Sequence, residues 1–344
     1  MHAVGVILHP QRDSAEAVEA VLRWAAGHGA EVCGIESEIK RLNCAATPVS
    51  AEEMGRRSDL LVAIGGDGTM LRAMRLADGR RAPVLGVNLG KLGFLAEVDV
   101  PELPSALSAI DAREFTTEPR LAIDCYVTGS NGESRPAVAD SQRATRRATA
   151  FNDIALVRVP GDKLAAVTVH AGGQPFVSYS ADAVIVATPT GSTAYSFSAG
   201  GPIVSPAVEA LLVTPAAPHS AYNRGVVLSV NDPVAFEVLP GSGRLAIEVD
   251  GRVAGYASPG EILDITPRPA ASRVVRLGYT TFYQRARRKL GITDSAGIAG
   301  PSLTGMADAG GVAESPAAAN GGHSNPEKNP SEGVTPHYGA AFRE

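Results

Sequence analysis

Short apolar runs alternate with amphipathic segments over the first 117 residues. The spacing of apolar residues over 13–28 is helical, and a second helical stretch is predicted for 69–78. The apolar runs that predict buried strands lie at 3–8, 30–35, 59–64 and 82–88. Strands that alternate with helices in this way predict an α/β N-terminal domain, residues 1–117, with a parallel sheet.

The pattern changes near Glu118, where strand-like runs follow one another with turn residues between them. This pattern predicts a second, β-rich domain over 118–273. The polar stretch 129–148 is predicted to be a long mobile loop within that domain. A strand followed by a basic helix is predicted for 274–292. Residues 293–344 hold few large apolar side chains, so we expect a disordered, low-complexity tail.

Composition narrows the class of protein. The chain has 344 residues, 44% of them hydrophobic, and a formal net charge of −5, which gives no support for nucleic acid or an anionic membrane as a partner. Its 3 cysteines lack the spacing of a disulfide framework or a zinc site. No apolar run approaches the roughly 18 residues that a membrane span needs. Because no signal-peptide pattern is present, we expect a cytoplasmic protein.

The stretch AIGGDGTML at 63–71 places one acid between glycines where a strand ends and a helix begins. Glycines let backbone N–H groups approach a ligand closely, and a helix start carries partial positive charge. We therefore predict a phosphate-binding loop made of Gly65, Gly66, Gly68 and Thr69. Asp67 in such a loop is suited to accept a proton from an attacking hydroxyl or to help hold a metal. A tight turn with Asp67 as a helix cap is the alternative.

Two further stretches carry candidate binding groups. Residues 180–204 run from an apolar strand into a segment dense in small and hydroxyl-bearing residues. Its hydroxyls offer donors for ribose or phosphate, and Tyr195 can stack on a ring; a polar loop capping a helix is the alternative. Asn152 and Asp153 interrupt another strand-like run, and such a pair can bind an adenine amine or a ribose diol. A turn at the start of a strand would also explain them.

Several familiar motifs are excluded. GVNLGKLG at 86–93 resembles a Walker A loop, but its glycine spacing is one residue short and Leu92 replaces the Ser or Thr that binds Mg²⁺. Thr190 and Ala194 stand where a serine nucleophile elbow needs glycines around Ser192. The first strand is not followed by Gly-x-Gly-x-x-Gly, so the standard dinucleotide fingerprint is absent as well.

With these stretches in hand, the sequence resembles the NAD kinase family. The matching residues, in family order, are Gly65–Thr69, NLGKLGFLAEV at 88–98, Asn152-Asp153, ATPTGSTAYSFSAGGPIV at 187–204, TPAAPHS at 214–220 and Asp250-Gly251. The glycine–acid loop alone is shared with diacylglycerol, sphingoid and 6-phosphofructo-type kinases. The Thr-Pro-Thr-Gly-Ser-Thr run is far more specific, and the resemblance extends from about residue 3 to residue 290.

The resemblance implies an NAD kinase/diacylglycerol kinase-like fold and a phosphotransferase activity. ATP would phosphorylate the 2′-hydroxyl of the adenosine ribose of NAD⁺, giving NADP⁺. A divalent cation such as Mg²⁺ and a homodimer or homotetramer are implied too. Inorganic polyphosphate remains open as the donor, and no residue is assigned as a metal ligand.

The resemblance also implies roles for individual residues. The implied NAD-binding residues are Asp67, Gly68, Arg72, Asn152, Asp153, Lys163, Asp182, Thr193, Ala194, Tyr195, Ser196, Phe197 and Ser198. Asp67 would accept the proton of the 2′-hydroxyl, and Arg72 would lie near phosphate. Asn152 and Asp153 would bind the adenosine end, and Asp182 the nicotinamide side. The segment 193–198 would close over the dinucleotide, and the basic helix 283–290 would pack back on the first domain.

The sequence departs from the family pattern at Ser180-Ala181-Asp182-Ala183, where many bacterial relatives carry Arg-x-Asp-Gly. The missing arginine removes a bidentate contact to a phosphate or to a neighbouring subunit. Two alternative functions remain, a kinase with a lipid or sugar acceptor and a nucleotide-binding regulator without turnover. The hydroxyl-rich run disfavours the first, and the intact Gly65–Thr69 loop argues against the second.

Overall fold

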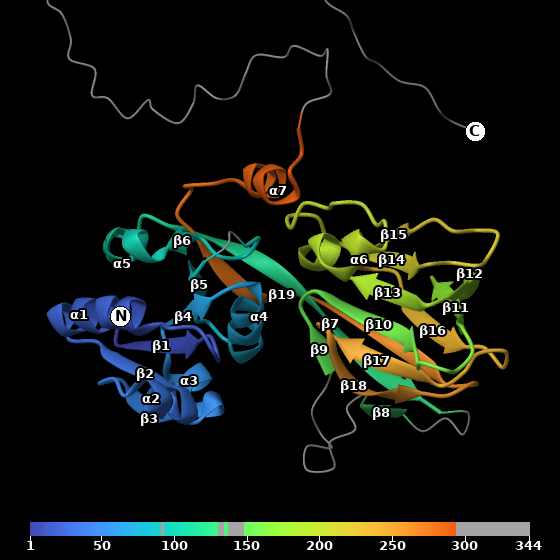
Figure 1. Cartoon of the computed structure of the whole chain (residues 1–344), viewed down its shortest axis with the longest axis horizontal. Coiled ribbons are helices and arrows are strands. Elements are labelled where there is room, and N and C mark those ends of the chain that lie inside the picture. Colours follow the sequence, from blue (N-terminus) through green and yellow to red (C-terminus); the bar gives the residue numbers. More distant parts are fainter. Residues whose placement is uncertain (91–92, 130–133, 137–147, 294–344) are drawn as a thin grey trace, which may run out of the picture. The chain divides into compact units, whose positions relative to one another are not determined.

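The computed structural model describes residues 1–90, 93–129, 134–136 and 148–293, and Met1–Thr293 belong to one structural unit (Figure 1). The predicted tail lies outside the described residues from 294 onward. Most of the predicted loop at 129–148 also lies outside them, apart from a short strand at Ser134–Pro136 and the start of another at Ala148.

Five parallel strands form the N-terminal part, in the order β3-β2-β1-β4-β5. Leu8 pairs with Ile64 and Gly65 with Asn88, so the carboxyl ends of β1, β4 and β5 are level. The predicted α/β part with a parallel sheet is confirmed. Its elements are β1 (Ala3–Leu8), α1 (Ala15–His28), β2 (Glu31–Ile35), α2 (Glu36–Leu42), β3 (Thr47–Val49), α3 (Ala51–Arg57), β4 (Leu60–Gly65), α4 (Asp67–Leu76), β5 (Val84–Asn88), β6 (Val98–Asp99), a 3₁₀ turn (Val100–Glu102) and α5 (Leu103–Asp111).

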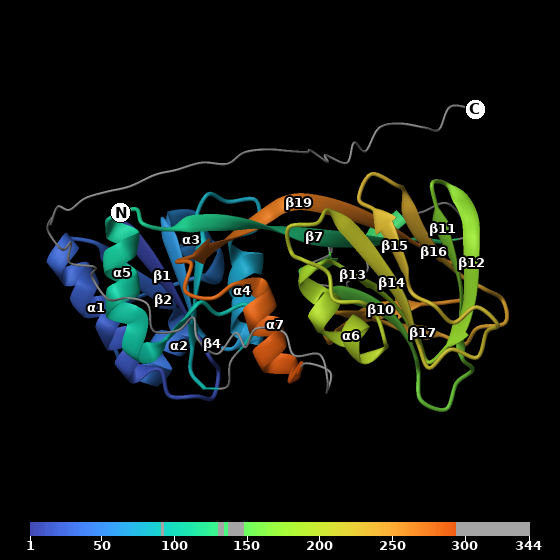
Figure 2. The ribbon, with the colours of Figure 1, turned by 90° about the horizontal axis from the view of Figure 1, so that it is seen from above.

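Helices cover both faces of these strands. Val4, Val6 and Leu8 of β1 pack with α1 and α5, whereas Ile7 packs with α3 and α4 on the opposite face. α1 and α5 lie side by side in both views (Figures 1 and 2). Because α4 begins directly after β4, its first turn stands at the edge where β1, β4 and β5 end, which is where open α/β sheets bind ligands.

Two packed sheets form the β-rich part. One contains β7, β11, β12, β16 and β19, the other has the order β15-β14-β13-β10-β17-β18, and apolar side chains of both line one core. The predicted β-rich second half is confirmed. Its elements are β7 (Thr116–Thr128), β8 (Ser134–Pro136), β9 (Ala148–Ala150), β10 (Asp153–Arg158), β11 (Ala165–Ala171), β12 (Gln174–Ala181), β13 (Ala183–Ala187), a 3₁₀ turn (Thr190–Thr193), α6 (Tyr195–Ser198), β14 (Ala210–Ala216), β15 (Val226–Ser229), β16 (Val234–Val238), β17 (Leu245–Val249), β18 (Arg252–Ala257) and β19 (Ile262–Arg276). The helix α7 (Phe282–Leu290) follows β19 and contacts Ala96 and Glu97, next to the α/β part.

The long strands β7 and β19 join the two parts. They pair antiparallel along their lengths, and Val274 of β19 also pairs in parallel with Val84 of β5. The parallel and antiparallel strands therefore belong to one 13-stranded sheet. The predicted boundary at 117/118 falls inside β7, and the division into two domains stays a prediction. No helix in the described part of the chain is long and apolar enough to span a membrane.

Candidate active site

The predicted phosphate loop is the connection between β4 and α4. Gly65 ends the strand and Gly66 is the N-cap of the helix. A Cβ on Gly65 would lie 2.2 Å from Oγ1 of Thr69, so the first helical turn can fold tightly over the strand end only with glycine there. The first N–H groups of a helix lack acceptors within the helix, so this edge is suited to bind an anion.

Asp67 is the first residue of α4, but a different segment holds its carboxylate. Oδ2 accepts the N–H of Phe94 and Oδ1 accepts the N–H of Leu95, each at 3.1 Å. Gly93 is required beside this contact, because a Cβ there would lie 2.2 Å from Oδ1. The helix-cap alternative is not observed, since Gly66 is the N-cap and α4 has no side-chain cap among the described residues. A carboxylate has about four acceptor positions, so Asp67 keeps capacity for a hydroxyl proton.

Asp250 fixes the turn that contains Asn152 and Asp153. Asp250 and Gly251 have φ values of 46° and 74° between β17 and β18, which is typical of a tight Asp-Gly hairpin turn. The Asp250 carboxylate accepts the N–H groups of Phe151, Asn152 and Asp153 at 3.2, 2.7 and 3.2 Å. The backbone of the predicted adenosine-binding pair is therefore held in one conformation.

An ion pair joins this turn to the helix that carries Asp67. Arg75 lies about two turns beyond Asp67 on α4, and its Nη2 donates to Oδ2 of Asp250 at 2.9 Å. The Asp250 side chain is fully buried, and burial raises its pKa despite the nearby guanidinium. Burial likewise lowers the pKa of Arg75. Removing either partner would leave a buried charge unpaired, so the pair ties α4 to the Asn152–Asp153 turn.

The hydroxyl-rich run packs against the same turn. The Thr188 N–H donates to the Asn152 carbonyl at 2.8 Å, and Thr188 Oγ1 donates to the Phe151 carbonyl at 2.5 Å. A Cβ on Gly191 would lie 2.1 Å from the Asn152 carbonyl oxygen, so only glycine fits. The structure thus brings together two stretches that the sequence marked separately.

The hydroxyl groups of this run do not all face outward. Ser192 and Ser196 are fully buried, and they hydrogen-bond with the backbone of Val204 and with the Thr214 hydroxyl, respectively. Ser196 therefore helps to shape the segment. The more accessible members of the predicted set are Thr193, Ala194, Tyr195, Phe197 and Ser198.

Asp153 is the ionisable group most affected by this packing. Its side chain is buried, and burial together with the Asp250 charge raises its pKa to about 7. A hydrogen bond from the Tyr195 N–H acts in the opposite direction. The Asp153 carboxyl therefore changes protonation near neutral pH, between the Asn152–Asp153 turn and the start of α6.

Arg72 belongs to a group of basic side chains at the carboxyl end of β1. It pairs with Glu38 and donates to the last carbonyl of β1 at 3.2 Å. Arg41 donates to the His9 carbonyl at 2.7 Å, and Arg12 lies against the loop after β5. Burial lowers the pKa of His9, and the three arginines lower it further. Neutral His9 accepts backbone N–H groups through Nδ1, and the arginines leave this edge positively charged.

Lys163 and Asp182 lie at the other end of β10. This strand begins at Asp153 and ends at Arg158, whose Nε pairs with Asp182 at 2.5 Å. At about 3.3 Å per residue the strand separates its two ends by roughly 16 Å. The structure therefore places the predicted NAD-binding residues in two groups, and Lys163 and Asp182 are not in the group around Asp67.

Three positions that shape the candidate site were missed by sequence reasoning. Gly93 and Asp250 lie inside stretches used for the family resemblance, but no role was assigned to them, and Arg75 was not noticed. The Asp-Gly pair is a recognisable turn signal. Its partners, Arg75 and the Asn152–Asp153 turn, are distant in the sequence, so only the fold reveals the contact.

Two protein-family models match this chain, one over its α/β part and the other over its β-rich part. Residues 4–115 match the ATP-NAD kinase N-terminal domain, and residues 151–277 match the ATP-NAD kinase C-terminal domain. The chain is 38% identical over 315 residues to NAD kinase 1 of Streptomyces avermitilis, covering 85% of this chain and 88% of that protein. It is 33% identical over 291 residues to NAD kinase of Desulforamulus reducens, covering 84% and 97%.

Two crystal structures share the fold. Yeast NADH kinase complexed with NADH aligns with a TM-score of 0.74 and 23% identity, covering 86% of this chain and 89% of that chain. An NAD kinase from Archaeoglobus fulgidus in complex with ATP aligns with a TM-score of 0.61 and 24% identity, covering 85% and 98%.

Proposed function

The chain belongs to the NAD kinase family, and from this premise we infer that it transfers a phosphoryl group from ATP to NAD, giving NADP. We further propose that the acceptor is the 2′-hydroxyl of the adenosine ribose and that Asp67 accepts its proton. The observation that carries this proposal is the position of Asp67. It is the first residue of α4, inside the phosphate loop, and its carboxylate accepts the backbone N–H groups of Phe94 and Leu95.

Phosphoryl transfer depends mainly on positioning and on neutralising phosphate charge. A ribose hydroxyl is a weak acid, so its attack is assisted by a base within hydrogen-bond reach. Asp67 is the acid of the phosphate loop, and the hydrogen bonds from Phe94 and Leu95 fix its direction. The proton of the 2′-hydroxyl goes to Asp67 as the oxygen attacks the terminal phosphorus of ATP, and the bond from that phosphorus to the bridging oxygen breaks to release ADP.

The donor's phosphates are assigned to the edge where β1, β4 and β5 end. The N–H groups at the start of α4, apart from that of Thr69, which donates to the Gly66 carbonyl, and the guanidinium groups of Arg12, Arg41 and Arg72 would neutralise them there. Among the described residues, no three His, Cys, Asp or Glu side chains gather as a metal site. We propose that a divalent cation enters bound to the donor's phosphates, as Mg²⁺ commonly does.

The acceptor is assigned to the Asn152–Asp153 turn, which Asp250 holds, and to the 193–198 segment that follows Thr188. Asn152 and Asp153 offer an amide and a carboxyl to the adenosine end, and Tyr195 offers a ring for stacking. Arg75 holds this turn to α4, so the hydroxyl that is presented and the base that deprotonates it are positioned together. The cytoplasmic location, the homo-oligomeric state and the contacts of Lys163 and Asp182 stay predictions.

The reaction is tested with the purified chain, NAD⁺ and Mg²⁺, using ATP and inorganic polyphosphate in separate reactions. NADP⁺ is measured with an NADP-specific dehydrogenase. We expect NADP⁺ with ATP, and the polyphosphate reaction shows whether the donor site accepts a second class of compound. Folded protein that binds NAD⁺ but makes no NADP⁺ with either donor would contradict the proposed function.

The role of Asp67 is tested with Asp67→Asn, which keeps the shape of the side chain and removes its basicity. We expect kcat to fall by roughly 10²–10⁴-fold, the range for loss of a general base, with a much smaller change in NAD⁺ affinity. Near-normal turnover would show that Asp67 is not the proton acceptor.

A further inference from the structure

The 93–97 segment has two sides, one facing Asp67 and the other facing a buried ionic network. On the first side, the N–H groups of Phe94 and Leu95 donate to Asp67. On the second, the Leu95 carbonyl accepts Nη1 of Arg276 at 3.2 Å, and the Ala96 carbonyl accepts Nη1 of Arg285 at 3.4 Å. Consecutive peptide groups thus connect the arginines to the carboxylate of Asp67.

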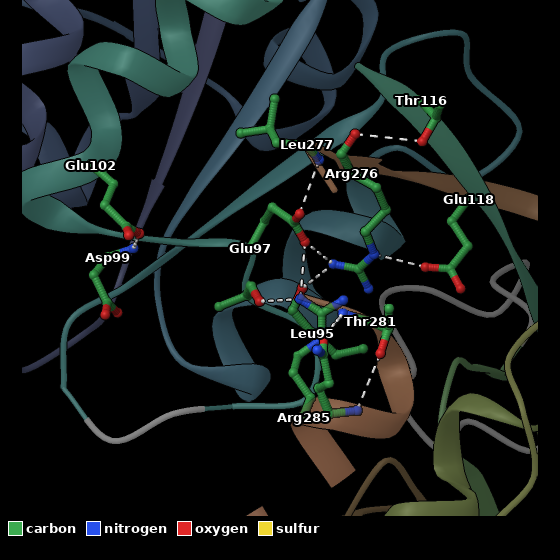
Figure 3. A network of polar contacts seen from close by, with 12 residues as sticks. Leu95, Glu97, Asp99, Glu102, Thr116, Glu118, Arg276, Leu277, Thr281 and Arg285 are labelled. Carbon is green, nitrogen blue, oxygen red and sulfur yellow. Dashed lines mark hydrogen bonds and ion pairs between the residues drawn. The ribbon is translucent and has the colours of Figure 1, made fainter. Parts of the chain in front are cut away.

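Glu97 is the centre of a network with Glu118, Arg276 and Arg285 (Figure 3). Arg120 joins the network through Glu118. The Glu97 side chain is fully buried and accepts Nη1 of Arg276 at 2.8 Å and Nη1 of Arg285 at 3.0 Å. Glu118 accepts Arg276 and Arg120, each at 2.7 Å. The arginines come from β7, β19 and α7, so three separate elements meet behind the 93–97 segment.

Stability alone does not account for this composition. The network holds three arginines and two glutamates, so its formal charge is positive in a largely buried place. Burial lowers the pKa of Arg285 and lowers that of Arg120 to about 9. Buried ion pairs often contribute little net stability, and an excess buried charge is unfavourable. The stability of the fold therefore does not explain why the network holds one arginine more than its two glutamates can neutralise.

Helix α7 reaches the same segment by a second contact. Nζ of Lys289 lies 5.5 Å from the centre of the Phe94 ring, within the range of a cation–π contact. Arg285 and Lys289 are four residues apart and so lie on one face of α7. Helix α7 therefore contacts Phe94, one of the two donors to Asp67, and also Ala96 and Glu97, which follow the other donor, Leu95.

We propose that Arg276 and Arg285 are positioning residues for phosphoryl transfer, acting through the 93–97 segment on Asp67. They hold the Leu95 and Ala96 carbonyls, which keeps the N–H groups of Phe94 and Leu95 aimed at the carboxylate. The inference rests on the proposed function, because it assumes that Asp67 is the proton acceptor.

The test compares Arg285→Gln with Arg120→Gln. Both variants remove one cation from the same network, but the side chain of Arg120 hydrogen-bonds to Glu118 and not to the 93–97 segment. We expect Arg285→Gln to lower kcat about tenfold or more, since a displacement of about 1 Å can cost about 100-fold. The KM values for NAD⁺ and ATP should change less than about twofold. Arg120→Gln should keep the wild-type kcat.

A double-variant comparison separates positioning from general damage. In the Asp67→Asn background there is no base left to position, so Arg285→Gln should cause little further loss of kcat. Arg285→Lys keeps the charge and a donor for both Glu97 and Ala96, so we expect it to recover much of the lost kcat. It also serves as the folded variant should Arg285→Gln fail to fold, with kcat still below the wild-type value.

The outcomes are distinct. Equal losses of kcat in Arg285→Gln and Arg120→Gln, or an equal loss in the Asp67→Asn background, would overturn the positioning role. Wild-type kcat in Arg285→Gln, or in Arg285→Lys when the Gln variant does not fold, would overturn it too. Full turnover in Asp67→Asn alone would instead refute the proposed proton acceptor, whatever Arg285→Gln does.

Discussion

Because the carboxyl of Asp153 is buried, we predict that the folded protein is more stable when this residue is neutral. Asp153→Asn replaces the carboxylate by a neutral group of the same shape that can still accept the Tyr195 N–H. Burial and the Asp250 charge raise the pKa of Asp153 from its ordinary value of 3.8 to about 7. The folded state therefore holds a proton that the unfolded state releases, and the stability of the wild-type protein falls as the pH rises from about 4 to about 7.

The size of the effect follows from the two pKa values. A shift from 3.8 to about 7 corresponds to at most about 4 kcal/mol above pH 7, at 1.36 kcal/mol per unit. At pH 5.5 the same arithmetic gives about 2 kcal/mol. The asparagine variant does not lose this energy. Its advantage in the free energy of unfolding should therefore grow by about 2 kcal/mol between pH 5.5 and pH 8.

Urea unfolding of the free protein at pH 5.5 and pH 8 measures this difference. Asp232→Asn, which changes an exposed carboxyl, is the control and should show no pH-dependent gain. An advantage of Asp153→Asn that is equal at both pH values would show that Asp153 does not titrate as the structure indicates. A less stable variant at pH 8 would show that the ionised carboxylate contributes favourable contacts.

Two further changes test the site. Gly93→Ala is expected to lower kcat about 100-fold in the NADP⁺ assay, because the added Cβ would lie 2.2 Å from Oδ1 of Asp67. Its control is Gly27→Ala, where a Cβ meets no described atom within 4 Å. A wild-type kcat in both variants would contradict the steric argument. Arg41→Gln is expected to raise the KM for ATP about tenfold, or about 1.4 kcal/mol, with the KM for NAD⁺ unchanged. Equal increases in both KM values would place Arg41 outside the donor site.

Local patterns in the sequence were sufficient to predict the main architecture. The apolar run at 3–8 became β1 with the same bounds, and the basic segment near 283–290 became α7. Among the elements that were not predicted are strands β12, β14 and β18 and helices α2, α3 and α5. β12 is an edge strand and begins with the largely exposed residues Gln174–Phe176, so it lacks a continuous apolar signal. The pairing of β19 with both β5 and β7 links distant segments, which periodicity does not encode.

The candidate site was predictable where residue type alone carries the chemistry. Asp67 and its glycines are recognisable because a carboxylate in a phosphate loop has few structural uses. Asp250 is different, since its carboxylate binds the backbone of Phe151, Asn152 and Asp153 across the fold. The donors to Asp67 could not be predicted either, because they are the backbone N–H groups of Phe94 and Leu95, which do not depend on residue type. Arg72 carries a recognisable charge, but its ion pair with Glu38 joins segments that are distant in the sequence and is visible only in the fold.

The contacts around α4 explain why the base and the acceptor site should act as one unit. Arg75 ties α4 to the Asp250 hairpin, and Asp78, just beyond its C-terminus, forms a bidentate pair with Arg268 of β19 at 2.7 and 2.6 Å. Arginine–carboxylate pairs of this kind fix direction as well as distance. Because Asp67 begins the same helix, a shift of the β-rich part relative to α4 would move the proposed acceptor site away from Asp67, the proposed base. Changes at these pairs should therefore lower kcat more than they raise the KM for NAD⁺, since they disturb alignment rather than binding.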